Sequence, residues 1–205
     1  MTTRAAEEIS VQKGDALIVV DMQNCFLPGG VLGVSSGDEV IGPLNRLIRI
    51  FQEKNLPVFF SRDWHPANHC SFHERGGPWP PHCVQNTEGA EFSPALAIPA
   101  GAIVFSKGTD PDMEEYSAWL ARDNAGRSLR DHVLGNKIER LFVGGLATDY
   151  CVLNTVKDAL REGHRTYILT DAVRAVNVNP GDAERAFKEM TAAGGVLITS
   201  KTVRA

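Results

Sequence analysis

Three side chains with the chemistry of an acyl-transfer site follow separate apolar runs of the chain. Asp21 and Lys107 each come directly after a short apolar run, and Cys151 follows a third run and two glycines. A thiol can act as a nucleophile, a carboxylate as its base, and a cation can stabilise the charges that form. Singly, Asp21 could be a loop cap, Lys107 a surface cation and Cys151 a small buried side chain. Their occurrence together predicts a nucleophilic site.

The residues around Cys151 predict an activated thiol. Gly144 and Gly145 allow the backbone to approach a ligand closely, and Thr148 is a suitable N-cap for a helix over about 148–163. Cys151 then falls in the first helical turn. There the helix dipole favours the thiolate and lowers the thiol pKa below its ordinary value of about 8.5.

A second chemical signal is a cluster of histidines. Four of the six histidines lie within 18 residues: His65, His69, His73 and His82. Asp63 and His65 leave an extended segment by the same face, and His82 could join them from across the loop. Two imidazoles and a carboxylate with open positions form a catalytic type of metal site, suited to zinc or iron. The alternative is a polar loop whose histidines only form hydrogen bonds.

The elements that must position these residues alternate between strands and helices. Apolar runs predict six strands, at 16–21, 58–61, 103–106, 141–143, 167–169 and 196–198. Helical spacing is present over 40–51, and further helices are expected at about 148–163 and 181–193. Wholly apolar strands between helices predict a parallel sheet covered on both faces, with ligands bound at the carboxyl ends of the strands. The long irregular stretch 64–101 is expected to be functional.

Composition excludes several classes of protein. The chain has 205 residues, a net charge of −4, 43% hydrophobic and 22% charged residues, which predicts a single globular domain over residues 1–205. We expect no nucleic-acid partner and no membrane span, because there is no basic excess and no long apolar run. The polar segment 1–15 lacks the pattern of a secretory signal. We therefore expect a cytoplasmic protein whose four cysteines are reduced thiols.

Five segments together resemble one known family. They are Val20-Asp21-Met22-Gln23-Asn24, Asp63-Trp64-His65-Pro66-Ala67-Asn68-His69, Trp79-Pro80-Pro81-His82-Cys83, Ser106-Lys107-Gly108-Thr109 and Gly145-Leu146-Ala147-Thr148-Asp149-Tyr150-Cys151-Val152. These segments resemble the nicotinamidase/pyrazinamidase group of the isochorismatase-like cysteine hydrolase superfamily. The resemblance runs from about residue 15 to 200 and implies a three-layer α/β/α sandwich with a mainly parallel six-stranded sheet.

The resemblance also implies a role for each matching residue. The catalytic triad falls on Asp21, Lys107 and Cys151. The metal ligands fall on Asp63, His65 and His82, with waters completing the shell. The oxyanion hole falls on the backbone N–H groups of Ala147 and Cys151, and the Leu146–Ala147 peptide bond matches one that is cis in relatives. The substrate pocket falls on Phe26, Trp79, Tyr116 and Ala147.

Some positions depart from the family pattern or vary within it. Cys25 stands where many relatives have Asp, which changes the hydrogen bonding expected beside Asp21. Relatives also differ in whether a further protein group approaches the metal, which leaves the roles of His69 and Ser71 open.

The activity implied is hydrolysis of nicotinamide to nicotinate and ammonia through a thioester, with pyrazinamide as a further substrate. The cofactor is one divalent metal ion, zinc in the first instance, with iron or manganese as alternatives. We expect a homo-oligomer, since relatives are often dimers or larger. Three alternatives are kept: an amidase of the same superfamily for carbamoyl or maleamate-type substrates, an isochorismatase, and a metal-binding module without turnover.

Overall fold

The computed structural model describes residues 8–205, and its centre is a six-stranded parallel sheet. The strands are β2 (Asp15–Val20), β3 (Val58–Asp63), β4 (Ile103–Lys107), β5 (Arg140–Leu146), β6 (Arg165–Arg174) and β7 (Val196–Ile198). They lie in the order β4-β3-β2-β5-β6-β7, and every neighbouring pair is parallel. The predicted six-stranded sheet is confirmed.

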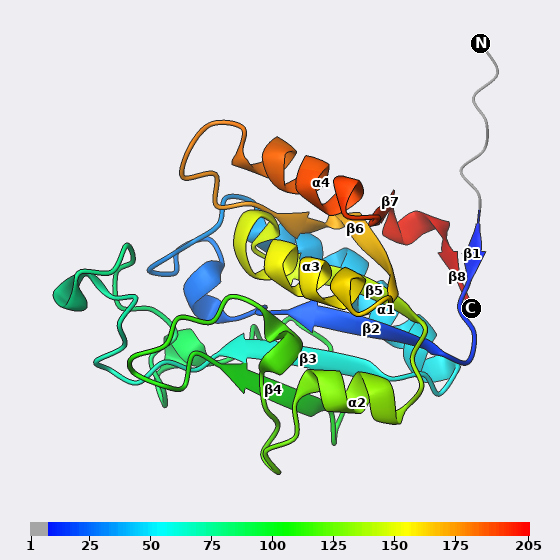
Figure 1. The fold of residues 1–205 in the computed structure, drawn as a ribbon, viewed down its shortest axis with the longest axis horizontal. Helices are drawn as coiled ribbons and strands as arrows, with labels where there is room; N and C mark the ends of the chain where they lie inside the picture. The colour runs from blue at the N-terminus through cyan, green and yellow to red at the C-terminus, as the bar shows by residue number, and fades with distance from the viewer. Residues whose placement is uncertain (1–7) are drawn as a thin grey trace.

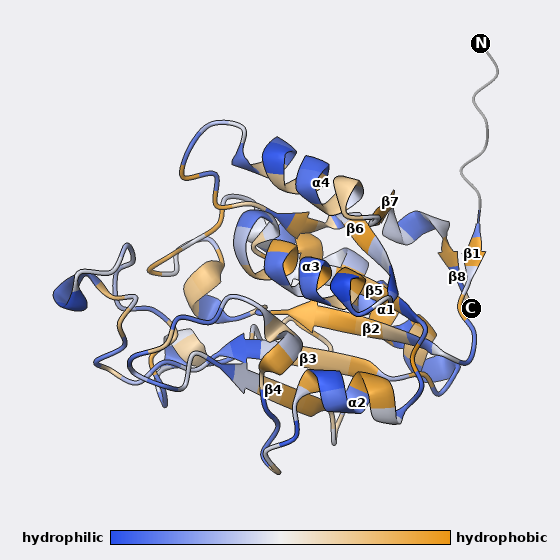
Figure 2. Cartoon of the chain, in the orientation of Figure 1, coloured by the Kyte–Doolittle hydropathy of each residue, from blue (hydrophilic) through white to orange (hydrophobic). Residues whose placement is uncertain are grey.

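Helices cover both faces of the sheet, which confirms the three-layer sandwich (Figure 1). Helix α1 (Ile41–Glu53) lies on one face, and α2 (Leu129–Gly135), α3 (Leu153–Arg161) and α4 (Asp182–Ala192) lie on the other. Successive side chains of a strand point to opposite faces, so a strand covered on both sides must be apolar throughout. β2 meets this requirement from Ala16 to Val20, which are apolar (Figure 2) and fully buried.

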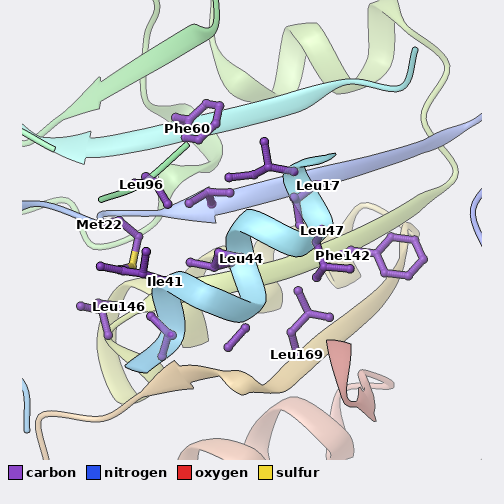
Figure 3. Close-up of a cluster of buried hydrophobic side chains, with 14 of the residues drawn as sticks. Leu17, Met22, Ile41, Leu44, Leu47, Phe60, Leu96, Phe142, Leu146 and Leu169 are labelled. Carbon is purple, nitrogen blue, oxygen red and sulfur yellow. The ribbon is translucent and has the colours of Figure 1, made fainter. Parts of the chain in front are cut away.

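The core under α1 follows from the helical spacing seen in the sequence. Leu44, Leu47 and Ile48 are fully buried on one face of the helix. They belong to the same buried cluster as Leu17 of β2 and Phe142 of β5 (Figure 3). The exposed residues of α1, Gly42, Arg49, Gln52 and Glu53, lie away from this buried stripe, as expected for an amphipathic helix.

Some elements were not predicted. α2 is only seven residues long, too short for a clear period, and it begins at a capping box formed by Ser128 and Asp131. A two-stranded parallel sheet joins β1 (Ile9–Ser10) to β8 (Val203–Arg204). In the described part of the chain, no helix is long and apolar enough to cross a bilayer.

The topology brings the candidate side chains to one edge of the sheet. The chain passes from β2 to β3 and β4 on one side, and returns to β5 on the other side of β2. Such a switch point opens a crevice at the carboxyl ends of the strands. Asp21 lies just beyond β2, and Asp63 is directly beside Lys107 where β3 and β4 end. The long loops gather at this end of the molecule (Figure 1).

The α1 interface gives a stability prediction. Leu44→Ala should lower the free energy of unfolding by about 2–5 kcal/mol, because it leaves a cavity between α1 and the sheet. Arg49→Ala, on the exposed face of the same helix, should change it by less than about 0.5 kcal/mol. Urea unfolding followed by circular dichroism measures both, and equal effects would contradict the packing described.

Candidate active site

A buried lysine lies at the centre of the site. The Lys107 Nζ lies 2.9 Å from Asp21 Oδ2 and 3.4 Å from Cys151 Sγ, and it also pairs with Asp63 Oδ1. Lys107 and Asp21 are both fully buried. Burial alone would lower the pKa of the Lys107 ammonium, but the carboxylates of Asp21 and Asp63 raise it well above its ordinary value. A permanent cation therefore separates two buried carboxylates.

Asp21 is positioned by the neighbouring strand. Its backbone N–H donates to the Ser61 carbonyl oxygen at 3.1 Å, and its Oδ1 accepts a hydrogen bond from Ser61 Oγ at 2.6 Å. Burial raises the pKa of the Asp21 carboxyl, while Lys107 and Ser61 act in the opposite direction and the charge of Asp63 adds to the rise. A carboxylate with a raised pKa is a better proton acceptor, which suits general-base chemistry.

The turn that carries Cys151 differs from the prediction. The N-cap is Ala147, with extended backbone at φ −100° and ψ 150°, and not Thr148. Thr148 is buried inside a π-helical turn, Thr148–Val152, which leads into α3. The predicted N-cap was wrong because the helical turn begins one residue earlier, so Thr148 already lies inside it. Cys151 still lies close to Asp21, with the thiol sulfur and a carboxylate oxygen within 4.8 Å of each other.

The predicted lowering of the thiol pKa was also wrong. Burial raises the pKa of the Cys151 thiol well above its ordinary value, and this outweighs the lowering effect of Lys107. The nearby carboxylates of Asp21 and Asp63 add to the rise. The thiol therefore keeps its proton until a base removes it, and Asp21 is the neighbouring carboxylate that can do so.

The strand before this turn passes very close to β2. Gly145 has φ +119°, and a Cβ there would overlap the Val20 backbone. The following Leu146–Ala147 peptide bond is cis, as the resemblance implied. Ala147 and Cys151 both line the same pocket.

Asp63, His65 and His82 form a cluster that could hold a metal ion. Each offers one ligand atom, and these atoms lie within 4.8 Å of one another. His65 Nδ1 donates to the Gly108 carbonyl oxygen and His82 Nδ1 to the Pro80 carbonyl oxygen, both at 2.9 Å. Each ring therefore keeps its Nε2 free as a ligand, the usual arrangement around metal-bound histidines. The donor set fits a divalent metal with open coordination positions.

His69 does not belong to this cluster of possible metal ligands. Its Nδ1 lies 2.7 Å from Ser71 Oγ, and its Nε2 lies 3.0 Å from the Met113 carbonyl oxygen. Its ring packs against that of His65, with centroids 4.1 Å apart. Ser71 therefore helps to fix the His69 ring, and the His69 ring packs against the ring of His65.

Gln23 is a supporting residue that the sequence did not single out. It is fully buried, and its Nε2 donates to the carbonyl oxygens of Asp63 at 2.7 Å and Ala90 at 2.9 Å. Its Oε1 accepts from the Asp63 backbone N–H at 2.8 Å. Gln23 thus fixes the backbone of a candidate metal ligand from both sides. Its position two residues after Asp21, beside the strand end, was the available signal.

A mainly apolar pocket opens beside Cys151. The residues lining it are Phe26, Leu32, Asp63, Trp79, His82, Glu114, Tyr116, Ala147, Tyr150, Cys151 and Val176. All four predicted substrate-binding residues are among them. Trp79 Nε1 donates to Tyr116 Oη at 3.1 Å, and the Trp79 ring stands edge-on to Tyr150 with centroids 5.0 Å apart. Leu32, Glu114 and Val176 were missed because they lie on separate loops that only the fold brings together, and Tyr150, in the turn that carries Cys151, was missed as well.

A disulfide joins Cys25 to Cys83, which contradicts the expectation of four reduced thiols. The two residues are 58 positions apart, and the fold brings their Cα atoms to 5.9 Å. Their pairing has no local sequence signal because Cys25 lies just after β2 and Cys83 lies in the long loop. Cys70 and Cys151 remain free thiols.

Comparison with known proteins places these features in a family. Residues 15–202 match the isochorismatase domain. The chain is 45% identical over 202 residues to the nicotinamidase of Escherichia coli (strain K12), covering 90% of this chain and 94% of that protein. The structure is similar to that of a pyrazinamidase of Pyrococcus horikoshii in complex with zinc, with TM-score 0.83, 47% identity and coverage of 91% and 99%. It is also similar to PnC1 from L. infantum in complex with nicotinate, with TM-score 0.86, 35% identity and coverage of 96% and 98%.

The role of Gln23 can be tested with a matched pair of variants. Gln23→Ala leaves three buried backbone groups without a partner, so it should destabilise the protein by about 1–3 kcal/mol and weaken metal binding about 10-fold. Asn45→Ala removes two similar hydrogen bonds to the 95–97 loop and should leave metal binding unchanged. Calorimetric titration with Zn²⁺ measures both, and equal affinities in the two variants would contradict the assignment.

Proposed function

Since this chain belongs to the isochorismatase family, we propose that it is a nicotinamidase, which hydrolyses nicotinamide to nicotinate and ammonia. One observation carries the proposal. A thiol, a carboxylate and a buried ammonium meet where Cys151 lines a mainly apolar pocket, and Asp63 and His82 of the metal-binding type of cluster line the same pocket. This arrangement has a place for an amide next to the thiol and a place for a heteroaromatic ring beside the cluster.

The first half of the reaction forms a thioester. Asp21 accepts the proton of Cys151, and the thiolate attacks the carboxamide carbon. The backbone N–H groups of Ala147 and Cys151 would stabilise the oxyanion, a type of interaction that contributes about 3 kcal/mol per donor. Asp21 then gives its proton to the departing nitrogen, which leaves as ammonia. Lys107 keeps the site near neutral charge while the proton moves.

The second half releases the acid. A water molecule attacks the thioester carbon, and Asp21 accepts its proton as it did that of the thiol. The C–S bond breaks, the sulfur of Cys151 takes the proton back from Asp21, and the acid leaves and gives up its own proton to solvent or ammonia, which yields nicotinate. The raised pKa of Asp21, caused mainly by its burial, favours this repeated transfer of a proton.

Asp63, His65 and His82 would hold one divalent metal ion, for which we propose zinc. The imidazole and carboxylate donor set supports zinc, and so does the zinc complex of the similar pyrazinamidase. When bound, the ion supplies a positive charge that attracts the lone pair of a ring nitrogen and so orients the substrate. Gln23 fixes the backbone of Asp63, while backbone carbonyls fix the rings of His65 and His82.

The pocket walls would enclose the substrate ring. Phe26, Trp79 and Tyr116 contribute aromatic faces and edges, and the Trp79–Tyr116 hydrogen bond holds two of them in place. Pyrazinamide has the same carboxamide on a ring of similar shape, so we propose that it is a second substrate. A carbamoyl or maleamate-type amide has no aromatic ring to use these walls.

The covalent step is tested by replacing the nucleophile. Cys151→Ala should lower the rate of ammonia release from nicotinamide by about 10³-fold or more, while zinc content stays near that of the wild type. The free thiol of Cys70 provides a control, since Cys70→Ser should keep the wild-type rate. Substantial turnover by Cys151→Ala would contradict the thioester mechanism, and a preference for maleamate over nicotinamide would contradict the substrate.

The metal cluster gives a separate prediction. His82→Ala should bind zinc at least about 10-fold more weakly, because losing a direct ligand should cost no less than losing a supporting group. Removal of metal by a chelator should likewise reduce nicotinamide hydrolysis in the wild type, and added zinc should restore it. His73→Ala, in the same loop but exposed, should bind zinc as the wild type does. Equal zinc content in the two variants, measured by atomic emission, would show that the assigned cluster is wrong.

A further inference from the structure

The Cys25–Cys83 disulfide joins two walls of the substrate pocket. Cys25 directly precedes Phe26, and Cys83 directly follows His82. The rings of Phe26 and His82 both line the pocket and pack against each other at a tilt of 56°, with centroids 5.7 Å apart. The covalent bond therefore connects an aromatic wall to a candidate metal ligand, and both half-cystines are 2% exposed.

The backbone of each half-cystine also holds a second residue of the site. The Cys25 carbonyl oxygen accepts a hydrogen bond from the Leu32 N–H, and the Cys83 carbonyl oxygen accepts one from the His65 N–H, both at 3.0 Å. Leu32 lines the pocket, and His65 belongs to the metal cluster. A displacement of Cys25 would thus be transmitted to the pocket wall, and a displacement of Cys83 to the metal cluster.

Other contacts would keep these segments folded without the disulfide. The Asn24 N–H donates to the Glu91 carbonyl oxygen at 2.9 Å, and Asn24 Nδ2 donates to the Glu88 carbonyl oxygen at 2.9 Å. Gln23 is independently bonded to Asp63 and Ala90. Reduction of the disulfide should therefore let the Phe26 and His82 segments move relative to each other without unfolding the site. Loss of such preorganisation weakens binding before it affects the chemical step.

We propose that the Cys25–Cys83 disulfide is a redox-responsive clamp on the substrate pocket, opened by a dithiol reductant. A thiolate of the dithiol attacks one sulfur and breaks the Cys25–Cys83 bond, forming a mixed disulfide. The second thiol then displaces the other cysteine. Two electrons and two protons pass to the protein, which gains two thiols, and the dithiol becomes a disulfide. The reduced protein binds nicotinamide more weakly, an inference that rests on the proposed function.

The first test is a count of thiols in the purified protein, unfolded in denaturant without reductant. The clamp requires two reactive thiols, those of Cys70 and Cys151, and four after treatment with dithiothreitol. Four thiols in protein kept under air would overturn the proposal.

The second test compares the oxidised and reduced protein in steady-state nicotinamide hydrolysis. Reduction should raise KM about threefold or more with kcat within about twofold, and reoxidation should reverse the change. The double variant Cys25→Ser/Cys83→Ser should show the higher KM and no response to dithiothreitol. Cys70→Ser should respond as the wild type does. An unchanged KM on reduction, or an equal response in the double variant, would overturn the clamp.

A readout independent of activity separates this proposal from the proposed function. The rate at which a chelator removes zinc should rise on reduction in the wild type and stay constant in the double variant, because Cys83 adjoins His82 and binds the His65 backbone. If no nicotinamide is hydrolysed in either redox state, the proposed function fails, and this rate alone decides on the clamp. A rate that does not change on reduction would overturn it.

Discussion

The ammonium group of Lys107 is the interaction on which the rest of the site depends. It is fully buried, yet it touches Asp21, Asp63 and Cys151. Two carboxylates this deep in a protein would repel each other and lose much of their solvation, and one shared cation offsets both effects. Lys107 therefore links Asp21 and Cys151 to Asp63 of the metal cluster through charge–charge contacts.

The sheet places these residues together because three strands end at the same edge. The apolar runs, their β-branched residues and the helical spacing between them were sufficient to predict six strands and a covered parallel sheet. The rule that ligands bind at the carboxyl ends of strands then placed Asp21 and Lys107 together. The sequence could therefore predict the sheet and the side chains that lie at the ends of its strands. The Asp63, His65 and His82 cluster was predicted differently, from the density of histidines in one loop, the two-residue spacing of Asp63 and His65, and the family resemblance.

Most features that the sequence could not predict depend on contacts between segments that are distant along the chain. Gln23 has no chemical signature of its own, and its importance comes from three hydrogen bonds to backbone groups 40 and 67 positions away. The Cys25–Cys83 disulfide likewise joins segments that no local pattern connects. The pKa of Cys151 was predicted from the helix dipole alone, whereas burial dominates it. Helix α2 was missed because seven residues are too few to show a period.

The most direct measurement of the central interaction is the stability of metal-free Lys107→Met as a function of pH. Without the ammonium, the pKa of the Asp63 carboxyl should rise above its unfolded value, and that of Asp21, which burial already raises, should rise further, so ionising them opposes folding. The variant should be about 3–5 kcal/mol less stable than metal-free wild type near pH 8, and the deficit should shrink as the pH falls and both groups take up protons. A deficit that stays the same from pH 4 to 8, or a variant as stable as the wild type, would contradict a lysine that neutralises two buried carboxylates.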